Sequence, residues 1–435
     1  MRLGNLPGRE WQVVLTIIFL ALGFRLLFIG FFGHPNIILD AREYEVMAEN
    51  ILAGRDLNTT PSDVPQFPVR VPVYGLFIAM IFGILGHSAS WVIVAQIVVS
   101  AGLCALTYLI ASRSLGNRRT AVIAGLLMAA HLPSWVHCGV LYPDTLFALL
   151  LGISVWGALQ LVETLSWKWA LGTGALVGFS TLCKAAGQGL VIVFVILLFI
   201  LGKTHLRRKA GLGALLLAGF VVVMAPWIAR NYVKFHAFVP TGTLAGFNFL
   251  TGNYRQLVPK ENTVMAALPP DMLEKSLKMN WIDRDAYFRR EGYKVFRQNI
   301  SDLPRRAILK TGIIFVDYPR LSLMDNIGYN TVISPRRSKA ITWAGVVQNS
   351  AYVLLALLAI LLCRGARRRF VVLVVLLLLY FWAGYVLTRS LSRYSVPLYP
   401  YICILSACSL SKLFELIMKQ RVKASPEECD PPTSA

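Results

Sequence analysis

The sequence predicts an all-α protein that crosses a membrane many times. Hydrophobic residues make up 56% of its 435 residues, and the mean hydropathy is +0.60. Several apolar runs approach or exceed the roughly 18 residues that a membrane-spanning helix needs. A long polar segment, 230–339, separates these runs into two groups. Together these observations favour a polytopic helical membrane protein over a soluble globular one.

Ten apolar runs are predicted to cross the membrane completely. The first begins WQVVLTIIF at Trp11, and no small-residue cleavage site follows its end at Phe32. We therefore expect it to be retained as a span rather than removed as a signal peptide. The ten predicted spans are 11–32, 89–112, 120–137, 142–163, 168–184, 187–202, 211–229, 341–362, 370–387 and 396–418.

An eleventh run, 71–86, is short, starts among prolines and contains three glycines. The distribution of basic residues between the spans indicates whether this run crosses the membrane, because short cytoplasmic loops are rich in Lys and Arg. If 71–86 crossed the membrane, the basic loop 113–119 would lie outside. If it is a half-helix on the outer side, all the basic pieces lie inside: 113–119, 203–209, 363–369 and 418–423. We predict the half-helix, with a full crossing as the alternative.

This topology places both chain ends in the cytoplasm and two long segments, 33–88 and 230–339, outside. The second segment shows helical amphipathic spacing at Phe288, Val295, Phe296 and Ile300. The predicted parts are a membrane core 1–229 that includes the loop 33–88, a mostly helical outer segment 230–339, C-terminal spans 340–418 and a cytoplasmic tail 419–435.

The net charge of +21 would suggest nucleic-acid binding in a soluble protein. In a membrane protein, basic residues hold cytoplasmic loops inside and contact anionic lipid headgroups. We therefore expect membrane lipids as partners and no nucleic acid. The seven cysteines are scattered and form no CxxC pair, so the sequence predicts neither a zinc site nor a disulfide framework.

The stretch DAREYEVMAENILAG (40–54) reads as an amphipathic helix. Asp40 stands where it can cap the first turn, and Glu43 stands at the third helical position, as in a capping box. A structural reading makes Asp40 only the cap of an interfacial helix. A functional reading makes it a carboxylate that faces an outer cavity.

Other polar residues are predicted at the same outer side: Arg70, His137, Asp144, Lys184, Arg230, Asn231, Arg389 and Arg393. Ionisable residues at membrane depth are costly and usually functional, although a single one is explained by snorkelling to the interface. We favour snorkelling for Arg389.

Taken together, the residues predict an outward cavity lined by carboxylates and cations. Cations stabilise a phosphate leaving group, and a carboxylate can activate an acceptor hydroxyl. An anionic, lipid-anchored donor fits such a site.

Five stretches in order resemble the GT-C class of membrane glycosyltransferases, in particular bacterial relatives of protein O-mannosyltransferases and of the aminoarabinose–lipid A transferase. The resemblance covers residues 11 to about 254. The stretches are DAREYEVMAENILAG, PVRVPVYGLFIAMIFGILG, GVLYPDTLFALLL, STLCKAAGQGL and APWIARNYVKFHAFVPTGTLAGFNFLTGN.

The resemblance implies a GT-C fold of 10–11 transmembrane helices in a bacterial inner membrane. It also implies inverting transfer of a sugar from a polyprenyl-phosphate donor to a glycan, lipid or protein acceptor, on the periplasmic face and without a cofactor or metal. Asp40 would be the catalytic base, and Glu43 would support it or bind the sugar. The residues predicted to bind the donor are Arg70, Tyr74, Asp144, Lys184, Arg230, Asn231, Arg393 and Tyr394.

The sequence departs from the family pattern at two places. Ala41 and Arg42 separate Asp40 from Glu43, whereas many relatives have adjacent acidic residues, and Pro143 precedes Asp144 where relatives have Thr. Two other functions stay open as alternatives, an oligosaccharide ligase and a lipid-linked sugar transporter or flippase. The absence of internal sequence halves counts against a transporter. We expect a monomer.

Overall fold

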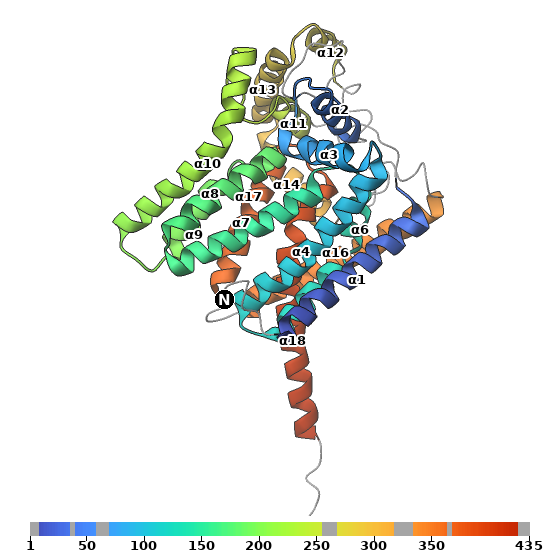
Figure 1. The fold of residues 1–435 in the computed structure, drawn as a ribbon, viewed down its shortest axis with the longest axis vertical. Coiled ribbons are helices and arrows are strands. Elements are labelled where there is room, and N and C mark those ends of the chain that lie inside the picture. The colour runs from blue at the N-terminus through green and yellow to red at the C-terminus, as the bar shows by residue number, and fades with distance from the viewer. Residues whose placement is uncertain are drawn as a thin grey trace, which may run out of the picture.

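The computed structural model describes residues 8–34, 40–57, 69–254, 268–316, 334–362 and 368–424. Within these ranges every regular element is helical, which confirms the predicted all-α fold (Figure 1). Residues 425–435 of the predicted tail, and Cys363 in a predicted basic loop, lie outside the described ranges.

Seven helices are long enough and apolar enough to cross a membrane alone. They are α1 (Gly8–Phe32), α4 (Ala89–Leu115), α7 (Asp144–Thr164), α10 (Leu206–Phe235), α16 (Pro335–Leu362), α17 (Arg368–Leu387) and α18 (Tyr399–Ala424), the last together with the short helix η8 (Ser392–Leu398). The other three predicted spans also coincide with helices. One is the bent pair α5 (Arg118–Ala129) and α6 (Leu132–Cys138), and two are the short helices α8 (Trp167–Cys183) and α9 (Leu190–Leu201).

The α5–α6 pair bends by 50° because the chain breaks at Ala130 and His131. A break at membrane depth leaves backbone carbonyls that need new donors. The buried Arg25 donates to the Ala129 carbonyl at 3.3 Å, and Trp135 donates to the same oxygen at 2.7 Å. Gln348 of α16 donates to the Ala130 carbonyl at 2.9 Å. These side chains hold the broken span in a bent shape.

Short α8 packs along α10 through glycines. A Cβ atom on Gly174 would collide with the Leu216 carbonyl, and one on Gly219 would collide with the Leu171 carbonyl. Small residues allow helix backbones to approach closely in a membrane. The close contact fixes α8, and therefore Lys184 at its C-terminal end, against the longer helix.

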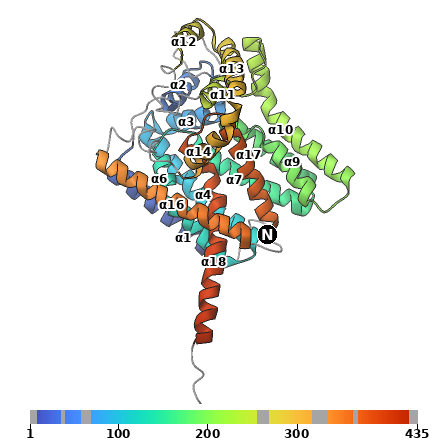
Figure 2. The same ribbon diagram turned by 180° about the vertical axis from the view of Figure 1, so that it is seen from behind.

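The predicted half-helix is α3 (Pro72–Leu85), and it lies across one end of the bundle beside α2 (Asp40–Leu52) (Figure 1). Figure 2 shows the same position of α2 and α3 from behind. With 14 residues, α3 is shorter than a full span needs, and its state as a half-helix stays a prediction. The two helices pack through Tyr44 and Tyr74, whose rings meet edge-on at 4.9 Å, and through Met47, which fills the space above Gly75. This packing positions the N-terminus of α2.

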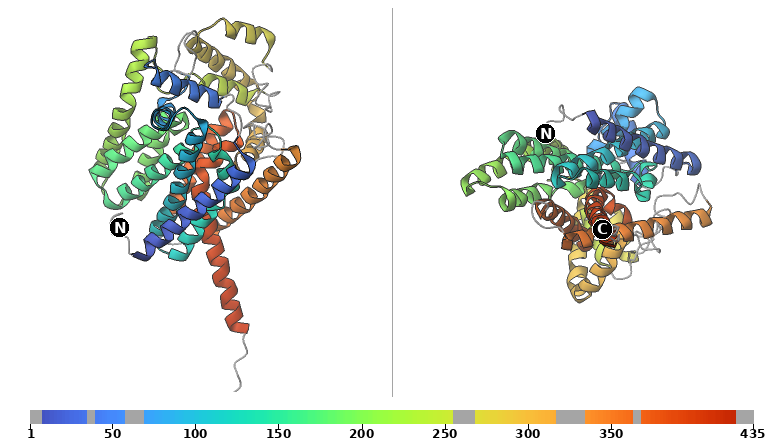
Figure 3. Two further views of the ribbon diagram at one scale, coloured as in Figure 1. Left: turned by 45° about the vertical axis from the view of Figure 1, so that its right-hand side comes forward. Right: turned by 90° about the horizontal axis from the view of Figure 1, so that it is seen from below.

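The described residues of the predicted outer segment are mostly helical, as predicted, and contain α11 (Ala245–Asn253), α12 (Pro270–Leu277), α13 (Trp281–Gln298) and α14 (Leu303–Phe315). A small core of its own holds Leu250, Leu268, Tyr287 and Phe288. Ile300, expected on the apolar face, follows the end of α13 and is exposed. Helices α2, α12 and α13 lie at the end of the molecule opposite the start of α1 and the C-terminal half of α18 (Figures 1 and 3).

Candidate active site

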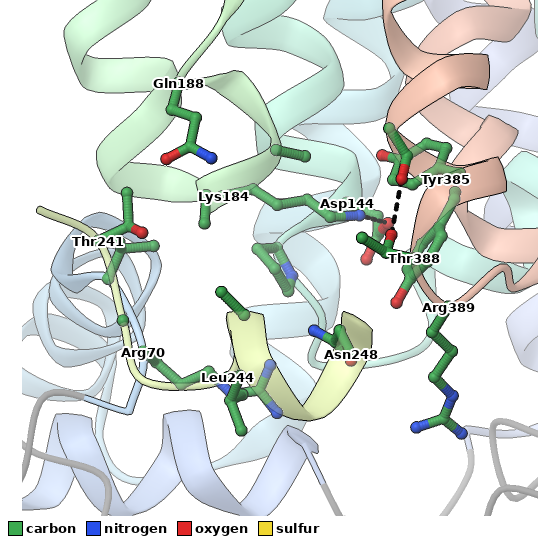
Figure 4. Close-up of a pocket in the computed structure, with 18 of the residues that line it drawn as sticks. Arg70, Asp144, Lys184, Gln188, Thr241, Leu244, Asn248, Tyr385, Thr388 and Arg389 are labelled. Atoms are coloured by element: carbon green, nitrogen blue, oxygen red, sulfur yellow. Dashed lines mark hydrogen bonds and ion pairs between the residues drawn. The ribbon is translucent and has the colours of Figure 1, made fainter. Parts of the chain in front are cut away.

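A cavity of about 420 Å³ opens among α2, α7, α11, α17, η8 and the break after α8. Figure 4 shows side chains from these separate elements around it. Six charged residues line the cavity: Asp40, Arg70, Asp144, Lys184, Arg389 and Arg393. Its apolar and polar walls include Tyr44, Gln188, Thr241, Leu244, Asn248, Tyr380, Phe381, Tyr385, Thr388 and Tyr394. The structure therefore brings together most of the residues that the sequence predicted for an outward site.

Asp40, the first residue of α2, has an arginine on each carboxylate oxygen. Arg70 donates to its Oδ1 at 2.5 Å, and Arg393 donates to its Oδ2 at 2.6 Å. Arg70 also donates through Nε to Glu43 at 2.6 Å. Arg70 therefore bridges Asp40 and Glu43, and Glu43 does not itself line the cavity. The supporting role of Glu43 stays a prediction.

A second ion pair lies on the α7 side of the cavity. Lys184 donates from Nζ to Asp144 Oδ1 at 2.5 Å, and the Asp144 side chain is only 3% exposed. Asp144 begins α7, where the positive end of the helix dipole favours a carboxylate. Figure 4 shows Lys184 reaching across the cavity wall to this carboxylate.

Aromatic rings join the two ion pairs into one polar surface. The Arg393 guanidinium lies 4.3 Å from the ring centre of Tyr142, and Lys184 lies 4.9 Å from that of Tyr394. Tyr394 also stacks on Tyr385 at 4.6 Å. Aromatic faces attract cations and restrict their motion, so the rings hold both cations toward the cavity.

The chain at Lys184 is extended, which ends α8 and turns the lysine into the cavity. Tyr380 of α17 closes this break: its hydroxyl donates to the Ala186 carbonyl at 2.7 Å and accepts from the Gly189 amide at 2.9 Å. A Cβ on Gly189 would clash with the Tyr380 ring, so this position requires glycine. The stretch KAAGQG is thus a break between two helices, and Tyr380 satisfies backbone groups that the break leaves open.

Charge in the cavity is unbalanced. Four cations and two carboxylates line it, and Glu43 pairs with one of the cations from outside the wall, which leaves a surplus of one positive charge. Burial by itself raises the pKa of Asp40, but the Arg70 and Arg393 guanidiniums outweigh this and hold its pKa well below the usual range. Asp40 is therefore ionised at neutral pH, and the surplus charge suits an anionic ligand such as a phosphate.

Three predicted donor-binding residues lie away from the cavity wall. Tyr74 is fully buried behind Tyr44 and donates to Gln96 at 2.9 Å. Arg230 pairs with Asp56 at 2.5 Å, and Asn231 is buried and donates to the Val239 carbonyl at 2.9 Å. The structure thus separates these three from Arg70, Asp144, Lys184, Arg393 and Tyr394, which line the cavity.

Two residues near the cavity were not predicted from the sequence. Arg389, for which the sequence favours snorkelling, lines the cavity. Lys310 of α14 donates to the backbone carbonyls of Gly252, Val386 and Thr388 at 2.8, 2.6 and 2.5 Å. Lys310 thereby holds the ends of α11 and α17, including cavity residue Thr388, in place. The position of Arg389 only four residues before Arg393 could have suggested a shared role; no local pattern marks Lys310.

Residues 63–229 match the family model described as dolichyl-phosphate-mannose-protein mannosyltransferase. This segment, less than half of the chain, is similar to that glycosyltransferase family. It contains Arg70, Asp144 and Lys184 of the cavity, whereas Asp40, Arg389 and Arg393 come from outside it. A search of curated protein sequences gives no match.

Among solved structures, the fold is similar to that of the oligosaccharyltransferase of Archaeoglobus fulgidus, solved with a tethered acceptor peptide. The identity is 14%, the TM-score is 0.53, and the match covers 96% of this chain and 51% of that one. The chain thus spans about half the length of that enzyme. The ArnT protein of Cupriavidus metallidurans also matches, at 16% identity over 96% of this chain and 80% of that one. Its TM-scores are 0.44 for the undecaprenyl phosphate complex and 0.42 for the apo state.

The similarity to the oligosaccharyltransferase confirms the predicted GT-C fold, and the family match over 63–229 agrees with the predicted glycosyltransferase class.

Proposed function

We propose that the protein transfers a sugar from a polyprenyl-phosphate donor to an acceptor hydroxyl at the outer, periplasmic face of a bacterial inner membrane. The family description names a dolichyl-phosphate sugar, which is a lipid-linked phosphate donor of this chemical type. The single observation that carries the proposal is the cavity itself, where an ionised Asp40 lies among cations in excess.

In the proposed reaction the acceptor oxygen attacks the anomeric carbon from the face opposite the phosphate. The bond between that carbon and the phosphate oxygen breaks, and the configuration inverts. Asp40 takes the acceptor proton, and the phosphate leaves with the bonding electrons. Arg70, Lys184 and Arg393 are the cations placed to stabilise the growing phosphate charge.

With Arg70 and Arg393 on its two oxygens, Asp40 is a weak base. A bound phosphate competes with Asp40 for Arg70 and Arg393. Their partial withdrawal raises the pKa of Asp40 and makes it a better proton acceptor. In this scheme the base becomes competent when the donor is present, which limits side reactions in its absence.

The aromatic wall formed by Tyr44, Tyr385 and Tyr394 offers ring faces and hydroxyls for a sugar. The acceptor belongs to the glycans, lipids or proteins of the cell envelope, each of which presents hydroxyl groups at this face. The alternative functions of ligase and flippase need no carboxylate held beside the cations. The pair of arginines on Asp40 therefore favours transfer.

Two measurements test the proposal. Native mass spectrometry of the detergent-purified protein should show binding of undecaprenyl phosphate, with undecaprenol, which lacks the phosphate, binding at least about tenfold more weakly. Mass spectrometry of envelope glycans from a strain without this gene should show the loss of one sugar substituent, restored by the intact gene. Equal binding of both lipids, together with unchanged glycans, would overturn the proposal.

A further inference from the structure

A cluster separate from the cavity joins α2 to the turn between α3 and α4. It contains Glu45 and Glu49, which lie one helical turn apart on α2, and His87, which follows α3. One ligand atom from each of the three side chains lies within 4.8 Å of the other two. None of the three residues lines the cavity.

Glu45 turns its two oxygens to different neighbours, whereas Oε1 of Glu49 faces both Arg42 and His87. Arg42 donates to Glu45 Oε2 at 2.5 Å and to Glu49 Oε1 and Oε2 at 2.9 and 3.5 Å. The other oxygen of Glu45, Oε1, faces His87 Nε2 at 3.7 Å, and Glu49 Oε1 lies 3.6 Å from the same nitrogen. Both separations are beyond hydrogen-bonding distance.

Glu45 is the buried member, with only 8% of the residue exposed. Its Oε2 is paired with Arg42, and its Oε1 has no hydrogen-bond donor among the described residues. This second oxygen faces an imidazole nitrogen, so a cation placed between them would have a ligand on each side. The His87 ring packs against Phe82 at 4.3 Å, and Gly86 holds the preceding turn at φ +89°, so the nitrogen stays aimed at the carboxylates.

We propose that Glu45, Glu49 and His87 form a binding site for a divalent transition metal, with zinc as the expected ion. Tetrahedral zinc bound at about 2.0–2.1 Å places its ligand atoms roughly 3.3 Å apart, so the observed 3.6 and 3.7 Å need only small side-chain shifts. An imidazole with two carboxylates is a donor set that zinc accepts, and water would complete the coordination. Arg42 can keep its contact with Glu45 Oε2.

The site would tie α2 to the end of α3, and its role is positional. Asp40 starts the same helix that carries Glu45 and Glu49, so a metal there would fix the helix that presents Asp40. Cysteine spacing could not indicate this site, because its ligands come from two helices and include no cysteine. The proposal rests on this cluster alone and holds or fails independently of the proposed transfer reaction.

The test uses tag-free, full-length protein in detergent, stripped with a chelator and then titrated with zinc against a chromophoric zinc chelator. Elemental analysis should give one zinc per chain, and zinc should raise the thermal midpoint of the stripped protein. His87→Gln should weaken zinc binding by at least about tenfold, since it removes one of three ligands. His205→Gln is the matched control, because His205 is an exposed histidine with no carboxylate near it in the ion pairs of the described residues.

Arg42→Ala provides a second variant. It should keep or strengthen zinc binding, because the arginine competes for the same carboxylates. X-ray absorption of the zinc-loaded protein should show one imidazole with oxygen ligands, and His87→Gln should remove the imidazole signal. No zinc above the level of the buffer, or equal affinities of the His87→Gln and His205→Gln variants, would overturn the proposal and leave an arginine–carboxylate network only.

Discussion

Two ion clusters of this molecule share one arrangement of charges around an aspartate and have different surroundings. The cavity cluster consists of Asp40, Arg70 and Arg393, with Glu43 behind Arg70, and the α10 cluster consists of Asp56, Arg230 and Lys234. Each places two cations on one aspartate. In both, burial raises the pKa of the aspartate, and the neighbouring cations outweigh burial and lower it.

The difference is the space beside the charges. Asp40, Arg70 and Arg393 line the 420 Å³ cavity, and no member of the α10 cluster is among its lining residues. Arg230 lies 5.0 Å from the ring centre of Trp227 and 5.3 Å from that of Phe235, and it donates to the Leu57 carbonyl at 3.4 Å. The α10 cluster therefore fastens the chain after α2 to α10. Two cations on a carboxylate indicate a site only where a ligand can reach them.

The largest expected effect contrasts the two aspartates. Asp40→Asn should lower sugar transfer by at least about a thousandfold, because it removes the base, and general-base catalysis typically contributes ~10²–10⁴-fold. Asp56→Asn should leave transfer within about threefold of the wild type and lower the thermal midpoint instead. The measurement is transfer by membranes that contain equal amounts of each protein. Near-normal transfer by Asp40→Asn would remove Asp40 from its catalytic role.

A smaller effect contrasts a cation of the cavity with one of the α10 cluster. Lys184→Gln should raise the apparent KM for the lipid donor roughly 10- to 100-fold and leave the KM for the acceptor nearly unchanged, because a charge-assisted contact with phosphate is lost. Arg230→Gln should change neither value by more than about threefold. Since Lys184→Gln leaves Asp144 buried without its cation, Lys184→Arg serves as a folded variant that should restore donor use in part. If donor KM rises for Arg230→Gln and not for Lys184→Gln, the assignment of the two clusters is reversed.

The pH dependence of transfer should distinguish the clusters next. Asp40 must be ionised to accept a proton, so activity falls as the pH decreases through its pKa. Because Arg393 helps to hold that pKa below the usual value, Arg393→Gln should move the acid limb of kcat/KM to higher pH. Lys234→Gln changes the equivalent cation of the α10 cluster and should leave the limb in place. If the acid limb of kcat/KM for Arg393→Gln stays at the wild-type pH, a group other than Asp40 controls that limb.

The smallest effect on activity is expected from two cysteine substitutions that test the membrane topology. They report on which side of the membrane each position lies, and transfer should stay unchanged. In a cysteine-free background, Lys278→Cys on α12 should react with an impermeant maleimide added outside, and Arg119→Cys at the start of α5 should react only after the cells are permeabilised. Both residues are exposed and lie in opposite parts of the predicted topology. Ready outside labelling at 119 would show that α3 crosses the membrane.

Much of the candidate site was predictable because ionisable residues in apolar surroundings are rare and costly. Asp40, Arg70, Asp144, Lys184 and Arg393 stand out in the sequence for this reason, and all five line the cavity. The same argument applied to Arg230 and Asn231, which lie elsewhere. A sequence shows that a charge lies near the outer face, but it does not show which neighbour neutralises it.

The sequence by itself determined the all-α membrane fold and the positions along the chain of the helices that form the predicted spans, because hydrophobic length is a local property. Only the tertiary structure decided which charges share a cavity. Asp40 and Arg393 are 353 residues apart and meet at 2.6 Å, and Lys310 pins the end of α17 from α14. It also decided which spans bend at a break, since Arg25, Trp135 and Gln348 supply the donors that the broken helix needs. Contacts of this kind depend on how helices pack, and no short stretch of sequence encodes them.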